Sequence, residues 1–180
     1  MKNILVFSGS NSSVSINQQL AVYAAGFLKK YKVQTITMCD FPAPLYSMDM
    51  EVREGFPENM LKLNALFDRQ EGFLISLPEH NGSITPVFKN AIDWLSRIEH
   101  PVFNGKTVCL LSASPGIRGG AHNLEQICAL MPFWGGRVIS SYSLGKFYDR
   151  WDADGSCLKD PGEKKKLLKT LNDFKKELET

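Results

Sequence analysis

The chain contains 180 residues, of which 43% are hydrophobic and 22% are charged, a composition typical of one folded domain. Lysine and arginine number 21 against 19 aspartate and glutamate, and a net charge of +2 gives no electrostatic reason to expect nucleic acid or an anionic membrane as a partner. A chain of this length buries about 70% of the surface that its unfolded form exposes, so we expect a single domain over residues 1–180 that needs no disulfide or metal.

The N-terminus and the cysteines carry no targeting or metal-binding signal. The apolar run at residues 4–7 ends at a Ser-Gly-Ser segment and is too short for a signal peptide or a membrane span, so we expect a cytoplasmic protein. The four cysteines form no zinc-type spacing. We interpret them as buried thiols, and they are Cys39, Cys109, Cys128 and Cys157.

Five short apolar runs, mostly β-branched or leucine, predict five strands. The predicted strands are residues 3–7, 33–38, 72–77, 107–112 and 137–144. Several of the runs are apolar on both faces, which is typical of a parallel sheet that helices cover on both sides.

Helix start signals lie between these runs. Ser15 with Gln18 fits a capping box, and Thr85 precedes Pro86, which stands where a first helical residue needs no N–H. Residues 160–163, Asp-Pro-Gly-Glu, combine both signals before a terminal helix. We therefore expect helices to begin near residues 16, 86 and 161.

Strands and helices thus alternate along the chain, which predicts an α/β fold with three layers and a doubly wound parallel sheet. Five strands at this length favour the order 2-1-3-4-5. Ligands of such sheets bind beyond the carboxyl ends of the strands, at the switch point between the first and third strands. The loops after the first, third and fourth strands are therefore candidate binding loops.

The first candidate loop, residues 8–17, reads SGSNSSVSIN and contains five serines, two asparagines and one glycine but no acid. Hydroxyl groups and free N–H groups at a helix N-terminus bind a phosphate dianion, because the helix dipole adds positive potential. The loop is neither a Walker A nor a GxGxxG motif, which disfavours nucleoside triphosphates and the usual dinucleotide mode. The sequence predicts a phosphate site here, with a serine-capped polar turn as the alternative.

The second candidate loop follows the third strand and reads LPEHNGSITP over residues 77–86. Its prolines and Asn81-Gly82 predict a rigid turn whose N–H groups can approach a flat heteroaromatic ring. Glu79 and His80 have no further ligand at metal spacing, so we expect no metal site. We find no hydrolase constellation either, because no Gly-x-Ser-x-Gly segment is present.

Four segments in register resemble the NADPH-dependent FMN reductases, a family of flavodoxin-like fold that includes quinone, azo-dye and chromate reductases. The phosphate loop of the family reads approximately GSxRxxSxN. Gly9, Ser10, Ser15 and Asn17 match this pattern, and Ser12 stands at the usual arginine.

The other three segments also follow the family pattern. The flavin loop of the family, approximately PEYNGSxPxxLKNAIDW, is matched over residues 78–83 and 89–94, with His80 in place of tyrosine. Residues 112–120, SASPGIRGG, resemble its SPGxxGG turn, and residues 41–51 resemble its PLPLYxxDxE stretch.

The resemblance implies FMN as the cofactor and NADPH or NADH as the hydride donor, with a quinone, azo or similar small molecule as acceptor. The residues implied at the phosphate are Ser10, Ser12, Ser15, Ile16 and Asn17. Those implied at the isoalloxazine ring are Pro78, Glu79, His80, Asn81, Gly82 and Ser83. Those implied at its pyrimidine or ribityl side are Ser114, Pro115 and Gly116.

The resemblance implies no catalytic side chain, because the flavin carries the chemistry. It also implies a homodimer or homotetramer, with residues 41–50 at the interface. Arg118 is a candidate for the extra phosphate of NADPH. Two other functions stay open: a flavodoxin-like electron carrier without NAD(P)H activity, and an interaction domain without flavin.

Overall fold

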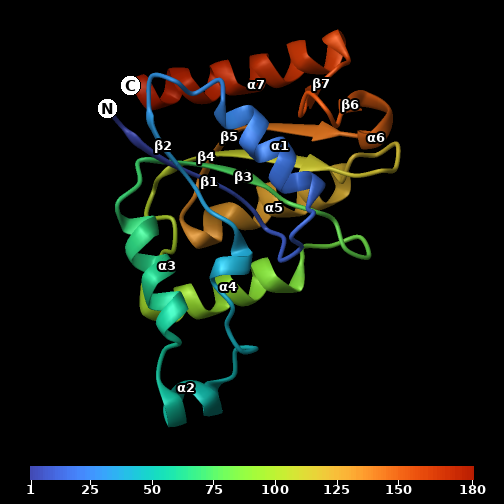
Figure 1. Ribbon diagram of the computed structural model, residues 1–180. Coiled ribbons are helices and arrows are strands. Elements are labelled where there is room, and N and C mark those ends of the chain that lie inside the picture. The colour runs from blue at the N-terminus through green and yellow to red at the C-terminus, as the bar shows by residue number, and fades with distance from the viewer.

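A single sheet of five parallel strands forms the centre of the computed structural model, which describes residues 1–180 (Figure 1). The strands are β1 (Asn3–Ser8), β2 (Lys32–Thr35), β3 (Gly72–Ser76), β4 (Thr107–Ala113) and β5 (Arg137–Leu144). Their order is β2-β1-β3-β4-β5, and every neighbouring pair is parallel. The predicted sheet and strand order are confirmed.

Helices cover both faces of this sheet. The helices are α1 (Ile16–Ala25), α2 (Met48–Glu54), α3 (Glu58–Asp68), α4 (Pro86–Ile98), α5 (Ala121–Leu130), α6 (Phe147–Arg150) and α7 (Pro161–Glu179). Figure 1 shows α1 and α7 on one face and α3, α4 and α5 on the other. A short antiparallel hairpin, β6 (Trp151–Asp152) with β7 (Cys157–Leu158), lies between α6 and α7. None of the helices combines the length and apolarity that a membrane span requires.

Two apolar cores fill the spaces between the sheet and its helices. Leu5 and Phe7 of β1 belong to the core under α3, α4 and α5, whereas Ile4 and Val6 belong to the core under α1 and α7. Successive side chains of a strand point to opposite faces, so a strand between two helix layers is apolar at every position. This explains why the strands show no polar alternation.

The three predicted helix caps are confirmed. The Ser15 hydroxyl accepts from Gln18 N at 3.2 Å, and the Asp160 carboxylate accepts from the N–H of Glu163 at 3.0 Å. Thr85 caps α4 ahead of its proline. These caps satisfy backbone N–H groups that have no partner inside the helix.

The edge strand β2 differs from its prediction. It ends at Thr35, and a 3-10 turn, η1 (Met38–Asp40), follows where the sequence predicted continued strand. The Thr37 hydroxyl accepts from Cys39 N and starts this turn. Helices α2 and α3, between β2 and β3, were not predicted.

The interpretation of the cysteines holds only in part. Cys109 is buried in β4, and burial raises the pKa of its thiol to about 12. Cys39 is exposed because it lies in η1 and not in the strand, so its expected burial is wrong. Cys128 and Cys157 are half-buried.

Candidate functional site

The loops that follow β1, β3 and β4 lie on one side of the molecule, away from the two chain ends (Figure 1). Parallel strands place their carboxyl ends at the same edge, and β1 and β3 are neighbours although β2 separates them in sequence. We call these segments the first loop (residues 9–15), the second loop (residues 77–85) and the third loop (residues 114–120).

The first loop is held by its own polar groups. The Ser10 hydroxyl accepts from the N–H of Ser12 at 3.1 Å, and the Ser12 carbonyl accepts from the N–H of Ser15 at 3.3 Å. Ser10 and Ser15 are buried, whereas Ser12 is exposed. Five backbone N–H groups of the loop and the first turn of α1 donate to no protein atom, and they belong to Ser10, Asn11, Ser13, Ile16 and Asn17.

These free donors fit a phosphate group. Backbone N–H groups at a helix N-terminus carry partial positive charge, and a phosphate offers several strong acceptors. No acidic residue precedes Asp40 in the chain, so nothing in the loop repels an anion. The first loop therefore fits the phosphate of FMN through backbone N–H groups and serine hydroxyls, without an arginine or lysine.

Gln18 of α1 holds the start of the first loop through its side chain. The capping-box motif did not predict this role. Its Oε1 accepts from the N–H of Ser8 at 2.9 Å, and its Nε2 donates to the carbonyl of Ile36 at 2.9 Å. The Gln18 side chain thus joins the end of β1 to the segment after β2. It does not return to Ser15, so the capping box is only half formed.

Asn17 uses its side chain inside the sheet. Its Nδ2 donates to the Ala113 carbonyl at 2.9 Å, while its Oδ1 accepts from the N–H of Ala113 and the hydroxyl of Ser76, both at 2.8 Å. Asn17 therefore joins α1 to the ends of β3 and β4. Only its backbone N–H is left for a phosphate.

The second loop contains a tight turn. Asn81 and Gly82 both have positive φ, 52° and 74°, and His80 and Ser83 exchange two backbone hydrogen bonds of 2.9 and 3.0 Å. This is the two-residue hairpin geometry that Asn-Gly favours. His80, Asn81 and Ser83 are exposed, and the N–H groups of Asn81 and Gly82 donate to no protein atom.

The first and second loops contact each other at Gly9. The Thr85 hydroxyl donates to the carbonyl of Gly9. A Cβ at Gly9 would lie 2.5 Å from the end of the Leu77 side chain and 3.1 Å from Cβ of Phe88, so a side chain here would displace buried side chains of the second loop and α4. The glycine thus permits the close approach of the first and second loops.

Glu79 faces α5 and not the turn. Its carboxylate accepts from the N–H of Asn123 at 3.1 Å, in the first turn of α5, whose residue at the cap position is Gly120. The Asn123 amide in turn donates to the carbonyls of Leu77 and Pro78, at 3.3 and 2.9 Å. Glu79 therefore caps a helix from outside, and Asn123 shapes the start of the second loop.

His122 lies beside the turn of the second loop. Its ring carbon Cδ2 is 3.9 Å from the position that a Cβ on Gly82 would occupy, and the histidine is exposed. Neither His122 nor Asn123 was predicted at this site, since both are about 40 residues away from the second loop in the chain. No local motif marks them.

The third loop packs against the turn between β5 and α6. The Ser114 N–H donates to Leu144 O at 3.1 Å, and the Gly116 carbonyl accepts from the N–H of Lys146 at 2.9 Å. Pro115, Gly116 and Arg118 are exposed. The first and second loops thus contact each other directly. The third loop approaches them only at its two ends: Asn17 bonds to Ala113, just before the loop, and Gly120, its last residue, lies beside Glu79.

Comparison with known proteins decides the family. Residues 2–149 match the family of NADPH-dependent FMN reductases, and this match includes all three loops. The chain belongs to this family. It is 32% identical over 160 residues to the NAD(P)H-dependent FMN reductase of Pseudomonas aeruginosa, an alignment that covers 85% of this chain and 80% of the relative.

One further relative by sequence and one solved structure are similar to this chain. A quinone reductase of Escherichia coli (strain K12) is 38% identical over 91 residues; the matched part is 49% of this chain and only about half, 48%, of that relative. A solved NAD(P)H:(acceptor) oxidoreductase of Paracoccus denitrificans has 23% sequence identity and a TM-score of 0.80, covering 99% of this chain and 98% of the other. At that identity, the likeness shows the flavodoxin-like fold.

As a family member, this chain departs from the FMN reductase pattern at Ser12 and His80. Both positions are exposed in the loops described above. Ser12 offers a hydroxyl where the family pattern has a guanidinium. His80 stands at the edge of the turn with its backbone paired to Ser83.

Proposed function

We propose that this protein is an FMN-dependent oxidoreductase that transfers a hydride from NAD(P)H to FMN and then two electrons to a quinone, azo or similar small acceptor. One observation carries the proposal: five free backbone N–H groups, in the acid-free first loop and the first turn of α1, lie next to an exposed Asn-Gly turn at the carboxyl ends of β1 and β3. Family membership supports it.

In this proposal the first loop binds the phosphate of FMN. The N–H groups of residues 10, 11, 13, 16 and 17 donate to its oxygens, and the hydroxyls of Ser10, Ser12 and Ser15 are at hand to donate as well. The dipole of α1 adds favourable potential without a counter-ion. Ser15 keeps its capping role, because its oxygen accepts from the helix while its hydroxyl proton stays free to donate.

The second and third loops hold the ring. The free N–H groups of Asn81 and Gly82 donate toward its polar edge, while Pro78, His80 and Ser83 supply the surrounding surface. Ser114, Pro115 and Gly116 lie on the pyrimidine or ribityl side. Glu79 is committed to α5, so its part is to position the turn. No side chain is needed as a general acid or base, because the flavin carries the chemistry.

A single preparation tests the function. The purified protein is loaded with FMN, its visible spectrum is recorded, and the consumption of NADPH and NADH is followed with benzoquinone as acceptor. We expect bound flavin and quinone-dependent oxidation of a nicotinamide. Bound flavin without oxidation of either nicotinamide would instead identify an electron carrier. Failure to bind FMN would identify an interaction domain that keeps the fold.

Arg118 is our candidate for selecting NADPH over NADH. It is exposed in a third loop without acidic residues, and it makes no ion pair. Lys146, which bonds to Gly116 of the same loop through its backbone N–H, is a second exposed cation there. An Arg118→Ala variant should raise the KM for NADPH about tenfold, by loss of a charge-assisted contact to the 2′-phosphate, and leave the KM for NADH unchanged. Equal effects on both donors would contradict this role.

We also propose that the protein is a homodimer or homotetramer joined through α2 and the segment before it. Figure 1 shows α2 standing away from the sheet and its helix layers. None of its residues is buried, and Leu45, Met48 and Val52 are 79%, 68% and 83% exposed. Apolar side chains grouped in this way are typical of an interface.

Sedimentation velocity tests this assembly. The unchanged protein should sediment as a dimer or tetramer, and a Val52→Glu variant should dissociate, because it would bury a charge at the interface. Val14, 78% exposed on the first loop, offers a matched control: Val14→Glu should leave the assembly intact. A monomeric unchanged protein would overturn the proposal.

A further inference from the structure

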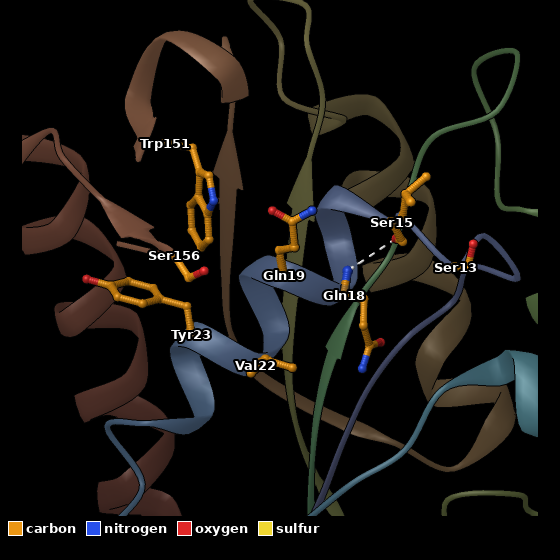
Figure 2. A pocket seen from close by; sticks show the side chains of 9 residues that line it. Ser13, Ser15, Gln18, Gln19, Val22, Tyr23, Trp151 and Ser156 are labelled. Carbon is orange, nitrogen blue, oxygen red and sulfur yellow. Dashed lines mark hydrogen bonds between the residues drawn. The ribbon is translucent and has the colours of Figure 1, made fainter. Parts of the chain in front are cut away.

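A pocket of about 240 Å³ lies between α1 and the β6–β7 hairpin (Figure 2). It is lined by Ser13, Val14, Ser15, Gln18, Gln19, Val22, Tyr23, Trp151 and Ser156. None of these residues belongs to the second or third loop. The pocket touches the first loop only through residues 13–15, so it is separate from the surface assigned to the flavin ring.

The size and lining of this pocket define the chemistry of an occupant. A water molecule takes about 30 Å³ in the liquid, so the space suits a compound with a single ring and is below the roughly 300–1,000 Å³ of sites for larger ligands. No lining residue is charged, and a buried charge without a partner is costly, so the occupant is neutral. Val22, Tyr23 and Trp151 supply apolar walls.

Trp151 adds a specific polar requirement. Its side chain is buried, with 6% of its surface exposed, and its Nε1 has no hydrogen-bond partner. Figure 2 shows this nitrogen on the edge of the indole that faces Gln19. A buried N–H without an acceptor is unfavourable and rare in folded proteins, so the site calls for an acceptor at this point.

The neighbouring side chains leave this donor to a ligand. The Tyr23 ring packs edge-on against Trp151, with ring centres 5.6 Å apart, and its hydroxyl points away from the pocket (Figure 2). Gln19 is exposed, and its side-chain amide makes no hydrogen bond. The Gln19 side chain is therefore free to swing aside and open a path to the indole nitrogen.

We propose that this pocket binds a small neutral aromatic compound whose carbonyl oxygen accepts the N–H of Trp151. Its ring packs against Val22 and Tyr23, and its outer edge contacts residues 13–15. Because residues 13–15 form part of the first loop, the occupied pocket holds that loop in place and strengthens FMN binding. This second statement rests on the proposed function, whereas the binding site itself does not.

Acetophenone, a single ring with one carbonyl, is the probe, and ethylbenzene, which lacks the carbonyl, is its control. Each is titrated into FMN-free protein labelled with nitrogen-15, and the indole N–H signals are followed by NMR. We expect acetophenone to move the signal of Trp151 and to leave that of Trp94 unchanged, since the Trp94 N–H is already bonded to Pro44 O at 2.8 Å. An unmoved Trp151 signal would overturn the proposal.

Two variants test the hydrogen bond. Trp151→Phe keeps an aromatic ring stacked on Phe147, as the indole is at 4.9 Å, but removes the donor, and the signal it abolishes assigns Trp151. It should weaken acetophenone about tenfold and ethylbenzene not at all. Gln19→Glu changes only an exposed position and places a competing acceptor next to the N–H, so it should weaken acetophenone as well. Equal binding of acetophenone to both variants and to the unchanged protein would overturn the proposal.

The coupling to FMN is measured last. With saturating acetophenone, the dissociation constant of FMN should fall about fivefold, and saturating FMN should tighten acetophenone by the same factor, because coupling is reciprocal. In the Trp151→Phe variant the same change in FMN affinity should need about tenfold more acetophenone, because the variant binds acetophenone more weakly. FMN binding that acetophenone does not alter would overturn the coupling, while failure to bind FMN at all would count against the proposed function and leave the NMR result standing.

Discussion

The first and second loops reach the same edge of the sheet but depend to different degrees on the rest of the chain. Inside the first loop, Ser10 and Ser12 accept from N–H groups two residues further along the chain. The second loop closes its own Asn-Gly turn, but its start is held by Asn123 of α5 and its end by the contact of Thr85 with Gly9. Hydrogen bonds made inside a loop can be predicted from its residue types, whereas contacts from residues distant in the chain cannot.

The largest expected effect is on the first loop. Ser15→Asp keeps a good helix cap but places a carboxylate where the phosphate binds, so FMN affinity should fall about 100-fold or more. Fluorescence titration of FMN measures the change. Ser15→Asn, a neutral cap of similar size, is the control and should stay within about tenfold of the unchanged protein. If Asp and Asn bound FMN equally, the first loop would not hold the phosphate.

Asn17 follows the first loop, and its side chain bonds to the strand ends from which the second and third loops start, so it tests how closely the loops depend on each other. Asn17→Ala leaves the N–H and carbonyl of Ala113 and the hydroxyl of Ser76 without this partner, and the free energy of unfolding should fall by about 2–4 kcal/mol. Urea unfolding measures it. Ser12→Ala, at an exposed position, should cost less than about 0.5 kcal/mol. If Asn17→Ala were as stable as the unchanged protein, the Asn17 side chain would not be needed for the fold, and a role at the phosphate would be favoured.

Ser12 tests whether the first loop lacks a charge that it can use. Ser12→Arg restores the residue of the family pattern and should tighten FMN about tenfold, through a charge-assisted hydrogen bond to the phosphate. Ser12→Gln, of similar length but neutral, should give a much smaller gain. Titration at low and high salt separates the two, because only the arginine effect weakens with salt. An arginine variant that binds FMN no better would show that the backbone already suffices.

The smallest effect is expected at the brace of the second loop. Glu79→Ala removes the acceptor for the N–H of Asn123 and should lower the free energy of unfolding by about 1 kcal/mol. Glu79→Gln keeps an acceptor, so its free energy of unfolding should fall by only a few tenths of a kcal/mol. Thermal unfolding compares the two. A large loss of FMN affinity with no loss of stability would place Glu79 at the ring after all.

Local signals predicted most of the fold. The caps at Ser15, Thr85 and Asp160 and the apolar runs located strands and helix starts because each depends on a few neighbouring residues. The expectation failed where position in the sheet decided the outcome. Strand β2, at the edge of the sheet, ends at Thr35 and not at residue 38, and Cys39 in the turn beyond it is exposed. Between β2 and β3, α2 does begin at a serine cap, since the Ser47 hydroxyl accepts from the N–H of Met50 at 3.1 Å, but this signal was not used to predict a helix. Helix α3 has no side-chain cap.

In the candidate site, too, local features were predicted and contacts between distant residues were not. Serine content and the absence of acids identified the first loop, and Asn81-Gly82 identified the turn of the second, since φ above zero suits these residue types. The partners of the loops could not be predicted. The Glu79 carboxylate accepts from the N–H of Asn123 in α5, and the Asn17 side chain joins α1 to the ends of β3 and β4. Their places at the ring and at the phosphate stay predictions.

Composition and local pattern were sufficient to predict a single parallel sheet, a serine-rich loop without acids and a rigid turn, because helix caps, turns and apolar runs each depend on a few neighbouring residues. The tertiary structure decided which side chains are free for a ligand and which bond to other parts of the chain. The reason is the chain crossover, which makes β1 and β3 neighbours and brings α5 against the second loop. The pocket at Trp151 is of this second kind. It exists because residues more than 120 positions apart in the chain, in α1 and the β6–β7 hairpin, pack together and leave one indole N–H without a partner.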